Sequence, residues 1–294
     1  CPCISLPFRK HSTTPQQLCV NGHGNHVGIQ LISNKYGKRK ALDLSDWGRP
    51  IARVFARFLK DKPVSVIQVT NLHFILTLFC AWLILQGQTI AACLLLVVKG
   101  VIDAIDGELA RIRRRPSHVG RYWDTIADVI GLVVVVFAFG ESLEWGYTLV
   151  LGMTFAILIQ YSLFNHFSLR LRASGLGDTT SRVDERKCPT AYPWESQKNV
   201  ERFHAIYVLC FSWQDRIVTT LSGPGTKELK IELTVSSILG FGFQSLILAS
   251  LAVVERIDLL PMIVLFANNL IFVFVILCSR LLHERGGTVV DSNT

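Results

Sequence analysis

Six stretches of the chain are apolar enough and long enough to predict helices that cross a membrane. They cover residues 69–86, 89–110, 122–140, 146–167, 233–254 and 258–279. A helix needs about 20 mostly apolar residues to span the hydrocarbon core of a bilayer. Stretches such as GLVVVVFAFG carry no polar stripe at the helical period, which a helix in a soluble bundle needs in order to face water. The pattern predicts an all-α integral membrane protein with six transmembrane helices, rather than six buried helices of a soluble bundle.

A different pattern precedes the first apolar stretch. Residues 46–62 (DWGRPIARVFARFLKDK) bring large apolar side chains to one helical face and Arg and Lys to the rest. The apolar face consists of Ile51, Val54, Phe55, Phe58 and Leu59. Pro63 then ends the helix. This pattern predicts an N-terminal interfacial amphipathic helix that lies on the anionic inner leaflet.

Composition and charge support the membrane interpretation and give it an orientation. Half of the 294 residues are hydrophobic and only 18% are charged, against about 25% in a soluble domain. All Lys and Arg except Lys99 and Arg256 fall in four segments, 1–68, 108–121, 168–232 and 280–294. If these segments are cytoplasmic, both termini are cytoplasmic and the spans number six. The net charge of +8 then belongs to a surface that faces the inner leaflet and phosphate groups, so no nucleic-acid partner is expected.

The same patterns divide the chain into three parts. Residues 1–45 form an N-terminal tail without periodicity, which we expect to be disordered. Residues 46–283 form the membrane domain, with a long cytoplasmic segment at 168–232 in which residues 203–221 form a surface helix or a partly inserted one. Residues 284–294 form a C-terminal tail. The Cys and His residues of the N-terminal tail match no zinc module, and the eight cysteines do not form a disulfide framework.

Four acidic residues lie inside the apolar stretches, where ionisable groups are expensive and usually functional. Asp103 and Asp106 are three residues apart, and Asp124 and Asp128 are four apart, so each pair shares one helical face. A short loop joins the two helices, so they should be antiparallel neighbours whose acidic faces meet. Four carboxylates at close range cannot all stay ionised unless cations neutralise them. Two divalent cations would do so, and hard oxygen ligands select Mg²⁺ or Mn²⁺, with Ca²⁺ as a further option.

The residues around the four aspartates suit a ligand that carries phosphate. Gly100, Gly107 and Ala110 are small and leave room above the cations. An arginine-rich rim follows, as a pyrophosphate requires, although the positive-inside bias alone accounts for part of it. Its members are Arg111, Arg113, Arg114, Arg115 and Arg121. The alternatives for the aspartates themselves are a structural polar cluster and a proton relay.

Residues 103–128 read DAIDGELARIRRRPSHVGRYWDTIAD. This matches D-x2-D-G-x2-A-R-x8-G-x3-D-x3-D at every fixed position, so the chain resembles the CDP-alcohol phosphotransferases (CDP-alcohol phosphatidyltransferases) over about residues 46–283. The resemblance implies transfer of a substituted phosphate from a CDP-linked substrate to an alcohol acceptor, with release of CMP. The donor is commonly CDP-diacylglycerol. Transfer of the CDP-choline or CDP-ethanolamine type to diacylglycerol, and transfer to an inositol phosphate, are alternatives.

The resemblance also implies roles for single residues. Asp103, Asp106 and Asp124 correspond to metal ligands, and Asp128 to a ligand that also accepts the proton of the attacking hydroxyl. The nucleotide contacts implied are Gly107, Ala110, Arg111 and Gly120. Members of the family are usually homodimers embedded in lipid, which we expect here as well.

Further candidates come from their position along the chain. Several cytoplasmic-side cations could bind an acceptor phosphate, namely Lys62, Arg113, Arg114, Arg115, Arg121, Arg170 and Arg172. Of these, Arg114, Arg115 and Arg121 are the preferred candidates. Thr70 and Asn71 lie at the right depth to reach the nucleotide, with helix capping as the alternative.

Two other functions fit the intramembrane acids less well. An ion- or proton-coupled transporter usually shows repeated halves around a site at the bilayer midplane. Here no repeat is visible, and the acids lie at the cytoplasmic end of their helices. An inactive member of the family would not be expected to keep the complete motif.

Overall fold

The structure is a computed structural model, and it describes residues 35–36, 41–174, 185, 187–223 and 229–287, with side chains up to residue 281. The chain divides into two units, Cys1–Leu31 and Ile32–Thr294, and only the second contains described residues. The predicted N-terminal tail therefore lies mostly outside the described part. Lys35 and Tyr36, however, bond to Asp43, and the described structure begins before the predicted boundary at residue 46.

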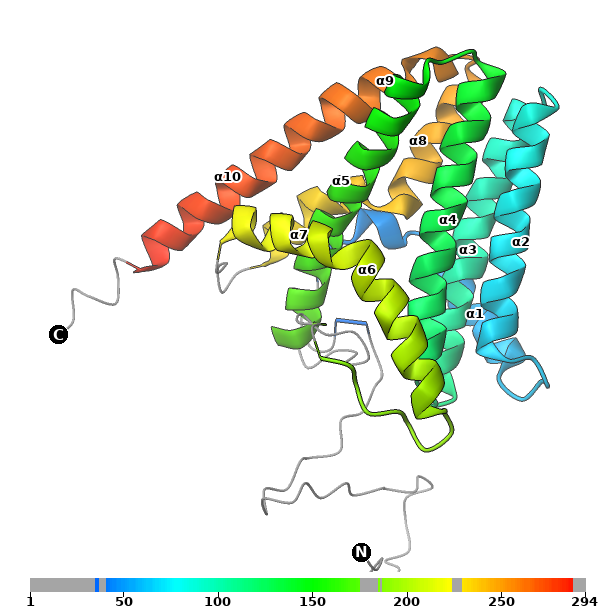
Figure 1. Cartoon of the computed structure of the whole chain (residues 1–294), viewed down its shortest axis with the longest axis vertical. Coiled ribbons are helices and arrows are strands. Elements are labelled where there is room, and N and C mark those ends of the chain that lie inside the picture. Colours follow the sequence, from blue (N-terminus) through cyan, green and yellow to red (C-terminus); the bar gives the residue numbers. More distant parts are fainter. Residues whose placement is uncertain (1–34, 37–40, 175–184, 186, 224–228, 288–294) are drawn as a thin grey trace, which may run out of the picture. The chain divides into compact units, whose positions relative to one another are not determined.

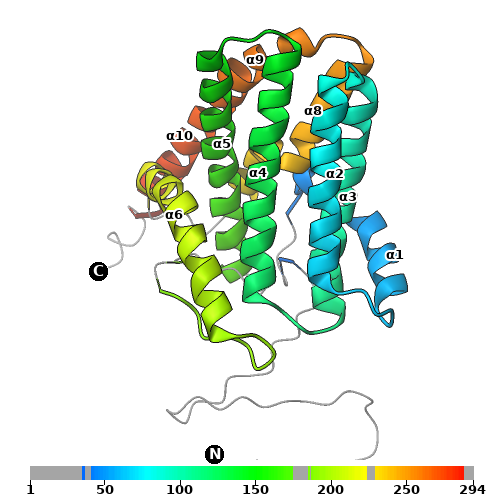
Figure 2. The same cartoon turned by 45° about the vertical axis from the view of Figure 1, so that its right-hand side comes forward.

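The described residues form helices and no strand, as predicted. Four long helices run side by side, α2 (Val66–Leu85), α3 (Thr89–Ile112), α4 (His118–Ser142) and α5 (Tyr147–Ser174), and the short α1 (Arg49–Leu59) packs against α3 (Figures 1 and 2). The helix α6 (Gln197–Ser222) crosses α4 and α5 obliquely. It settles the secondary structure of residues 203–221, which form one helix that packs against the bundle.

The composition of the helices supports a multi-pass membrane protein, but among the described residues it identifies fewer than six spans. Within the described residues, four segments are long and apolar enough to cross a bilayer, namely Val66–Leu85, His118–Ser142, Tyr147–Ser174 and Ile257–Leu281. A bent pair, Lys230–Leu239 with Phe241–Val253, would add a fifth. The remaining predicted span, α3, has 24 residues, but Lys99, Asp103 and Asp106 interrupt its apolar stretch. The charges of the candidate site thus keep this helix from resembling a span by composition.

The predicted span at 233–254 is broken rather than continuous. It consists of α7 (Lys230–Ser236), the 3₁₀ turn Ser237–Leu239 and α8 (Phe241–Val253), bent by 42°. At the break, Gly240 has an extended backbone, and the N–H of Gly242 donates to Ser45 Oγ at 3.0 Å. A Cβ atom on Gly242 would lie 1.9 Å from the carbonyl oxygen of Ser45. The short 3₁₀ helix Leu44–Asp46 therefore packs into the break, and Gly242 leaves room for it.

The last apolar stretch also departs from a simple helix. After a 3₁₀ turn at Ile257–Leu259 and a short α9 (Leu260–Met262), residues Ile263–Ala267 form a π-helical turn that leads into α10 (Asn268–Gly287). Gln160 of α5 donates to the carbonyl oxygen of Val264 within that turn at 2.9 Å. An amide from another helix thus satisfies a backbone oxygen inside a largely apolar region.

Close approach of α2 and α4 depends on Gly131. A Cβ atom on this residue would lie 2.7 Å from Thr77 Cγ2 of α2, a distance that real Cβ atoms do not tolerate. Along the chain, Gly131 follows Asp124 by about two turns of α4, and Thr77 follows His73 by about one turn of α2. Gly131 therefore helps to bring the ionisable side chains of these two helices together.

We predict that Gly131→Ala lowers the melting temperature of the detergent-purified protein, because overpacking costs about 1–3 kcal/mol. The matched control is Gly152→Ala on α5, where an added Cβ meets nothing within 4 Å. That change should leave stability unchanged or raise it, because Ala favours a helix over Gly by about 1 kcal/mol. Equal melting temperatures for the two variants would contradict the close α2–α4 contact.

Candidate active site

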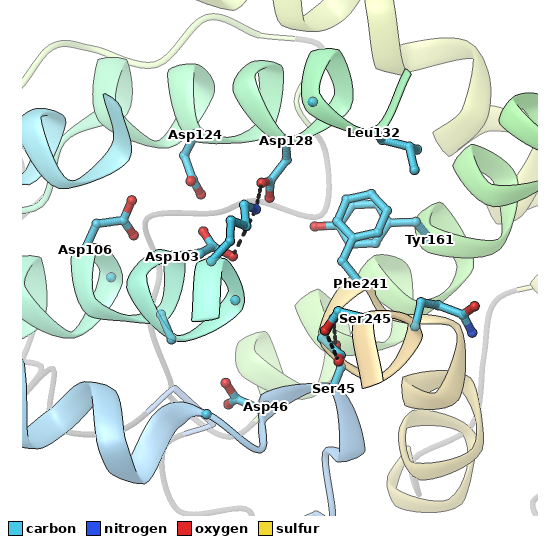
Figure 3. Close-up of a pocket in the computed structure, with 18 of the residues that line it drawn as sticks. Ser45, Asp46, Asp103, Asp106, Asp124, Asp128, Leu132, Tyr161, Phe241 and Ser245 are labelled. Carbon is cyan, nitrogen blue, oxygen red and sulfur yellow. Dashed lines mark hydrogen bonds and ion pairs between the residues drawn. The ribbon is translucent and has the colours of Figure 1, made fainter. Parts of the chain in front are cut away.

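The four aspartates of the motif face one another across the gap between α3 and α4. Asp103 and Asp106 lie on the last turns of α3, and Asp124 and Asp128 on the first turns of α4 (Figure 3). The two helices are antiparallel and joined by a short loop, as the spacing predicts. The sequence therefore placed these four carboxylates correctly relative to one another.

A histidine that the sequence analysis did not single out completes this cluster. His73 of α2 is fully buried, and its Nε2 lies 3.2 Å from Asp124 Oδ1, 3.7 Å from Asp103 Oδ1 and 3.8 Å from Asp106 Oδ2. One ligand atom from each of these four residues lies within 4.8 Å of all the others. The donor set suits a divalent cation, because oxygen and imidazole nitrogen are both common ligands of such ions.

Thr70 holds one of the carboxylates from α2. Its Oγ1 donates to Asp106 Oδ2 at 2.7 Å, and both side chains are buried. The alternative of helix capping does not apply, since Ser65 caps α2 through a capping box with Gln68. Asn71, the next residue, is not brought to the site. Its Oδ1 accepts from Trp123 Nε1 at 2.7 Å on the outer side of the helix pair.

Asp128 has a different partner from the other three aspartates. The ammonium group of Lys99, one turn before Asp103 on α3, donates to Asp128 Oδ1 and lies 3.9 Å from Asp103 Oδ2 (Figure 3). Lys99 lies within the apolar stretch 89–110, but the sequence alone indicates no partner for it. Its charge offsets part of the negative charge where Asp128 and Asp103 approach.

A cavity of about 420 Å³ opens above the cluster. The small residues and arginine of the motif line it, as expected for Gly107, Ala110, Arg111 and Gly120. The N–H of Gly120 donates to Ser117 Oγ at 2.8 Å, and an added Cβ would lie 3.0 Å from the same oxygen. Gly120 thus leaves room for the Ser117 hydroxyl that caps α4 at the edge of the cavity.

The cytoplasmic-side arginines differ in their position relative to the cavity. Arg121 lines the cavity, donates to Glu185 and stacks over the ring of Tyr122, and Arg172 of α5 also lines it. Arg114 and Arg115 lie outside the cavity, and the guanidinium of Arg115 is 5.6 Å from the centre of the Trp194 ring.

Arg113 has a structural position instead. It donates to the carbonyl oxygens of Leu59, Lys60, Lys62 and Val64. This arginine therefore ties the end of α3 to the linker between α1 and α2.

A second group of charges lies on the opposite wall, near the start of α1. Arg49 pairs with Asp46 and with Glu108, and Arg111 Nη2 lies 3.1 Å from Glu108. Burial by itself would raise the pKa of Asp46, but Lys35 and Arg49 bring that pKa down to about 2. Asp46 therefore remains ionised at neutral pH, and it forms part of the cavity wall.

Comparison with known proteins agrees with this site. Residues 66–222 match the CDP-alcohol phosphatidyltransferase family over more than half of the chain, and the protein belongs to that family. It is thus an enzyme of this transferase class and not the alternative transporter, and the family uses divalent metal ions.

Two relatives are similar over part of the chain. The archaetidylinositol phosphate synthase of Pyrococcus horikoshii is 26% identical over 140 residues, which cover 47% of this chain and 71% of that protein. The bifunctional IPC transferase and DIPP synthase of Thermococcus kodakarensis is 30% identical over 118 residues, which cover 39% of this chain and 27% of that protein. The chain therefore spans only about a quarter of the second relative.

We predict that Thr70→Val weakens Mn²⁺ binding by about 10- to 100-fold, as loss of a hydrogen bond to a metal ligand does in other sites. The control is Thr154→Val on α5, because Thr154 Oγ1 bonds only to the Val150 carbonyl oxygen of its own helix, at 2.8 Å. Isothermal titration of the purified variants measures both affinities. Wild-type affinity in Thr70→Val would show that this hydroxyl does not position Asp106.

Proposed function

We propose that the protein transfers a phosphatidyl group from CDP-diacylglycerol to an alcohol acceptor and releases CMP. Two divalent cations, Mg²⁺ or Mn²⁺, with Ca²⁺ as a further option, are held by Asp103, Asp106, Asp124 and Asp128. The single observation that carries the proposal is the convergence of these four carboxylates, from two antiparallel helices, beneath an open cavity that the motif's small residues line.

The chemistry divides between the aspartates and the cavity wall. The acceptor oxygen forms a new bond to the phosphorus that carries the lipid, the phosphoanhydride bond to CMP breaks, and CMP leaves with that electron pair. Asp128 accepts the hydroxyl proton, and Lys99 holds its carboxylate in place. A bound divalent cation supplies charge neutralisation at the phosphate oxygens. Gly107, Ala110 and Gly120 admit the nucleotide phosphates, and Arg111 offers them a positive charge.

The acceptor in this proposal carries a phosphate of its own. The names of the two relatives refer to inositol phosphate or to IPC transfer, which favours an inositol-phosphate-type acceptor over choline or ethanolamine chemistry. Two arginines of the cavity wall have buried guanidinium nitrogens that find no hydrogen-bond partner among the described residues. These are Nε and Nη2 of Arg121 and Nε of Arg172. Free, buried guanidinium donors are suited to a phosphate, so we assign the acceptor phosphate to these two residues and not to Arg114 or Arg115.

The proposal includes a membrane orientation. We take α3 as a span and the bent pair α7–α8 as another, which gives six spans with both termini and the active site on the cytoplasmic side. Ala52 and Ala56 of α1 are buried against the bundle, whereas Ile51, Val54, Phe55 and Phe58 are exposed. This exposed apolar face supports the role of α1 as an interfacial helix in contact with membrane lipids. We also propose a homodimer, as is usual in the family.

The function is tested by incubating the purified protein with Mn²⁺ or Mg²⁺, CDP-diacylglycerol and a panel of radiolabelled acceptors. We expect CMP release with inositol phosphate and none when a chelator removes the metal. Absence of CMP release with every acceptor, and with donors of the CDP-choline type, would refute the proposed reaction.

We predict that Asp128→Asn lowers the rate of CMP release by about 10²- to 10⁴-fold, the usual cost of losing a general base. Asp258→Asn, an exposed change outside the cavity, is the control and should keep the wild-type rate. Gel filtration and thermal unfolding check that both variants are folded. A wild-type rate in folded Asp128→Asn would rule out the assigned base.

We predict that Arg172→Gln raises the KM for inositol phosphate by about 10- to 100-fold, as expected from loss of a charged hydrogen bond, with little change in the KM for CDP-diacylglycerol. Arg115→Gln, outside the cavity, should leave both KM values as they are. The assignment of the acceptor phosphate fails if the two variants behave alike.

A further inference from the structure

A nitrogen donor faces the carboxylates of the site, although the motif itself contains no histidine among its fixed positions. His73 lies on α2, thirty residues before the first aspartate of the motif, and its Nε2 is directed at Asp103, Asp106 and Asp124. The side chain is fully buried, so water does not compete for this nitrogen. Its Nδ1 is also buried, and no residue in the described part of the chain bonds to it. All polar interactions of the ring are therefore made through Nε2, toward the acidic cluster.

The distances fit a shared cation. Ligand atoms that each lie about 2.0–2.2 Å from one ion are separated by about 3 Å when adjacent and by about 4.3 Å when opposite. The Nε2 atom of His73 is 3.2, 3.7 and 3.8 Å from the nearest oxygens of Asp124, Asp103 and Asp106. All three separations fall within this range. Asp128 lies outside this group of four residues, and its Oδ1 pairs with Lys99.

Helix packing places His73 on the side of α2 that meets α4. Thr77 Oγ1 donates to the carbonyl oxygen of His73 at 2.8 Å, and Thr77 in turn contacts Gly131 of α4. One turn earlier on the same helix, Thr70 holds Asp106. His73 is thus directed inward by the same helix contact that brings α2 and α4 together.

We propose that His73 Nε2 is a direct ligand of one of the divalent cations, which gives that ion one nitrogen and three carboxylate ligands. Imidazole favours transition metals, whereas Mg²⁺ prefers an all-oxygen set. His73 therefore shifts the preference of this site from Mg²⁺ toward Mn²⁺. The inference rests on the proposed function only in requiring a cation at the aspartates.

The direct test is pulsed electron paramagnetic resonance of the wild-type protein loaded with one equivalent of Mn²⁺. We expect a directly coordinated ¹⁴N signal that changes to the ¹⁵N pattern when the protein is made with ¹⁵N-labelled histidine. This comparison needs no substitution, so it does not depend on whether a variant folds. A spectrum without histidine nitrogen coupling would overturn the inference and leave His73 as a hydrogen-bond partner of Asp124.

The variant test uses His73→Gln, which replaces the nitrogen by an amide oxygen. We expect loss of the nitrogen coupling and a decrease in the ratio of Mn²⁺ to Mg²⁺ affinity on the order of tenfold. His166→Gln, on α5 and outside the cavity, is the matched control and should keep both properties. An unchanged affinity ratio in folded His73→Gln would contradict the proposed selectivity.

The two hypotheses fail in different ways. If CMP is released normally but no histidine nitrogen couples to Mn²⁺, the ligand assignment is wrong and the proposed function stands. If the nitrogen coupling is present but no donor and acceptor pair releases CMP, the ligand assignment is supported and the proposed function is wrong.

Discussion

Four carboxylates that meet at one point between helices are the constraint on which the rest of the structure depends. Two like charges 4 Å apart repel by about 4 kcal/mol at an effective dielectric constant of 20, so the cluster requires positive charge and hydrogen-bond donors around it. The described residues supply Lys99 to Asp128, Thr70 to Asp106 and His73 to Asp124. The negative charge that these groups leave uncompensated can attract a cation and the arginines of the cavity. The same balance of charges therefore affects both substrate binding and the stability of the structure.

Much of the site was predictable because it depends on helical spacing. Intervals of three and four residues place Asp103 with Asp106 and Asp124 with Asp128, and the short loop between the helices forces the two faces together. The sequence did not reveal His73, because no other ionisable residue lies three or four positions away on the same helix. Its role depends on how α2 packs, which spacing within one helix does not reveal. The same limit explains Thr70 and Asn71, since adjacent positions point about 100° apart and only the first faces α3.

The fold was predictable at the level of apolar stretches and less so in their details. Sequence patterns predict helices at each stretch, but the break at Gly240 follows from the packing of Ser45 against Gly242, two segments far apart in the chain. For α3 the difficulty lies in composition, because the charged residues of the site make this helix less apolar than a typical membrane span. Arg113 belongs to the predicted phosphate-binding rim, yet its guanidinium donates to carbonyl oxygens of Leu59 and Val64 instead.

The central claim is that α2, α3 and α4 build one cation site together. Equilibrium Mn²⁺ binding to Asp106→Asn on α3 and Asp124→Asn on α4, each compared with the wild type, tests it most directly. If both helices hold the same ion, each substitution alone lowers affinity by at least about tenfold, since a ligand is lost and not merely a neighbour. Wild-type affinity in either folded variant would show that the two helices do not share the ion and would contradict the account.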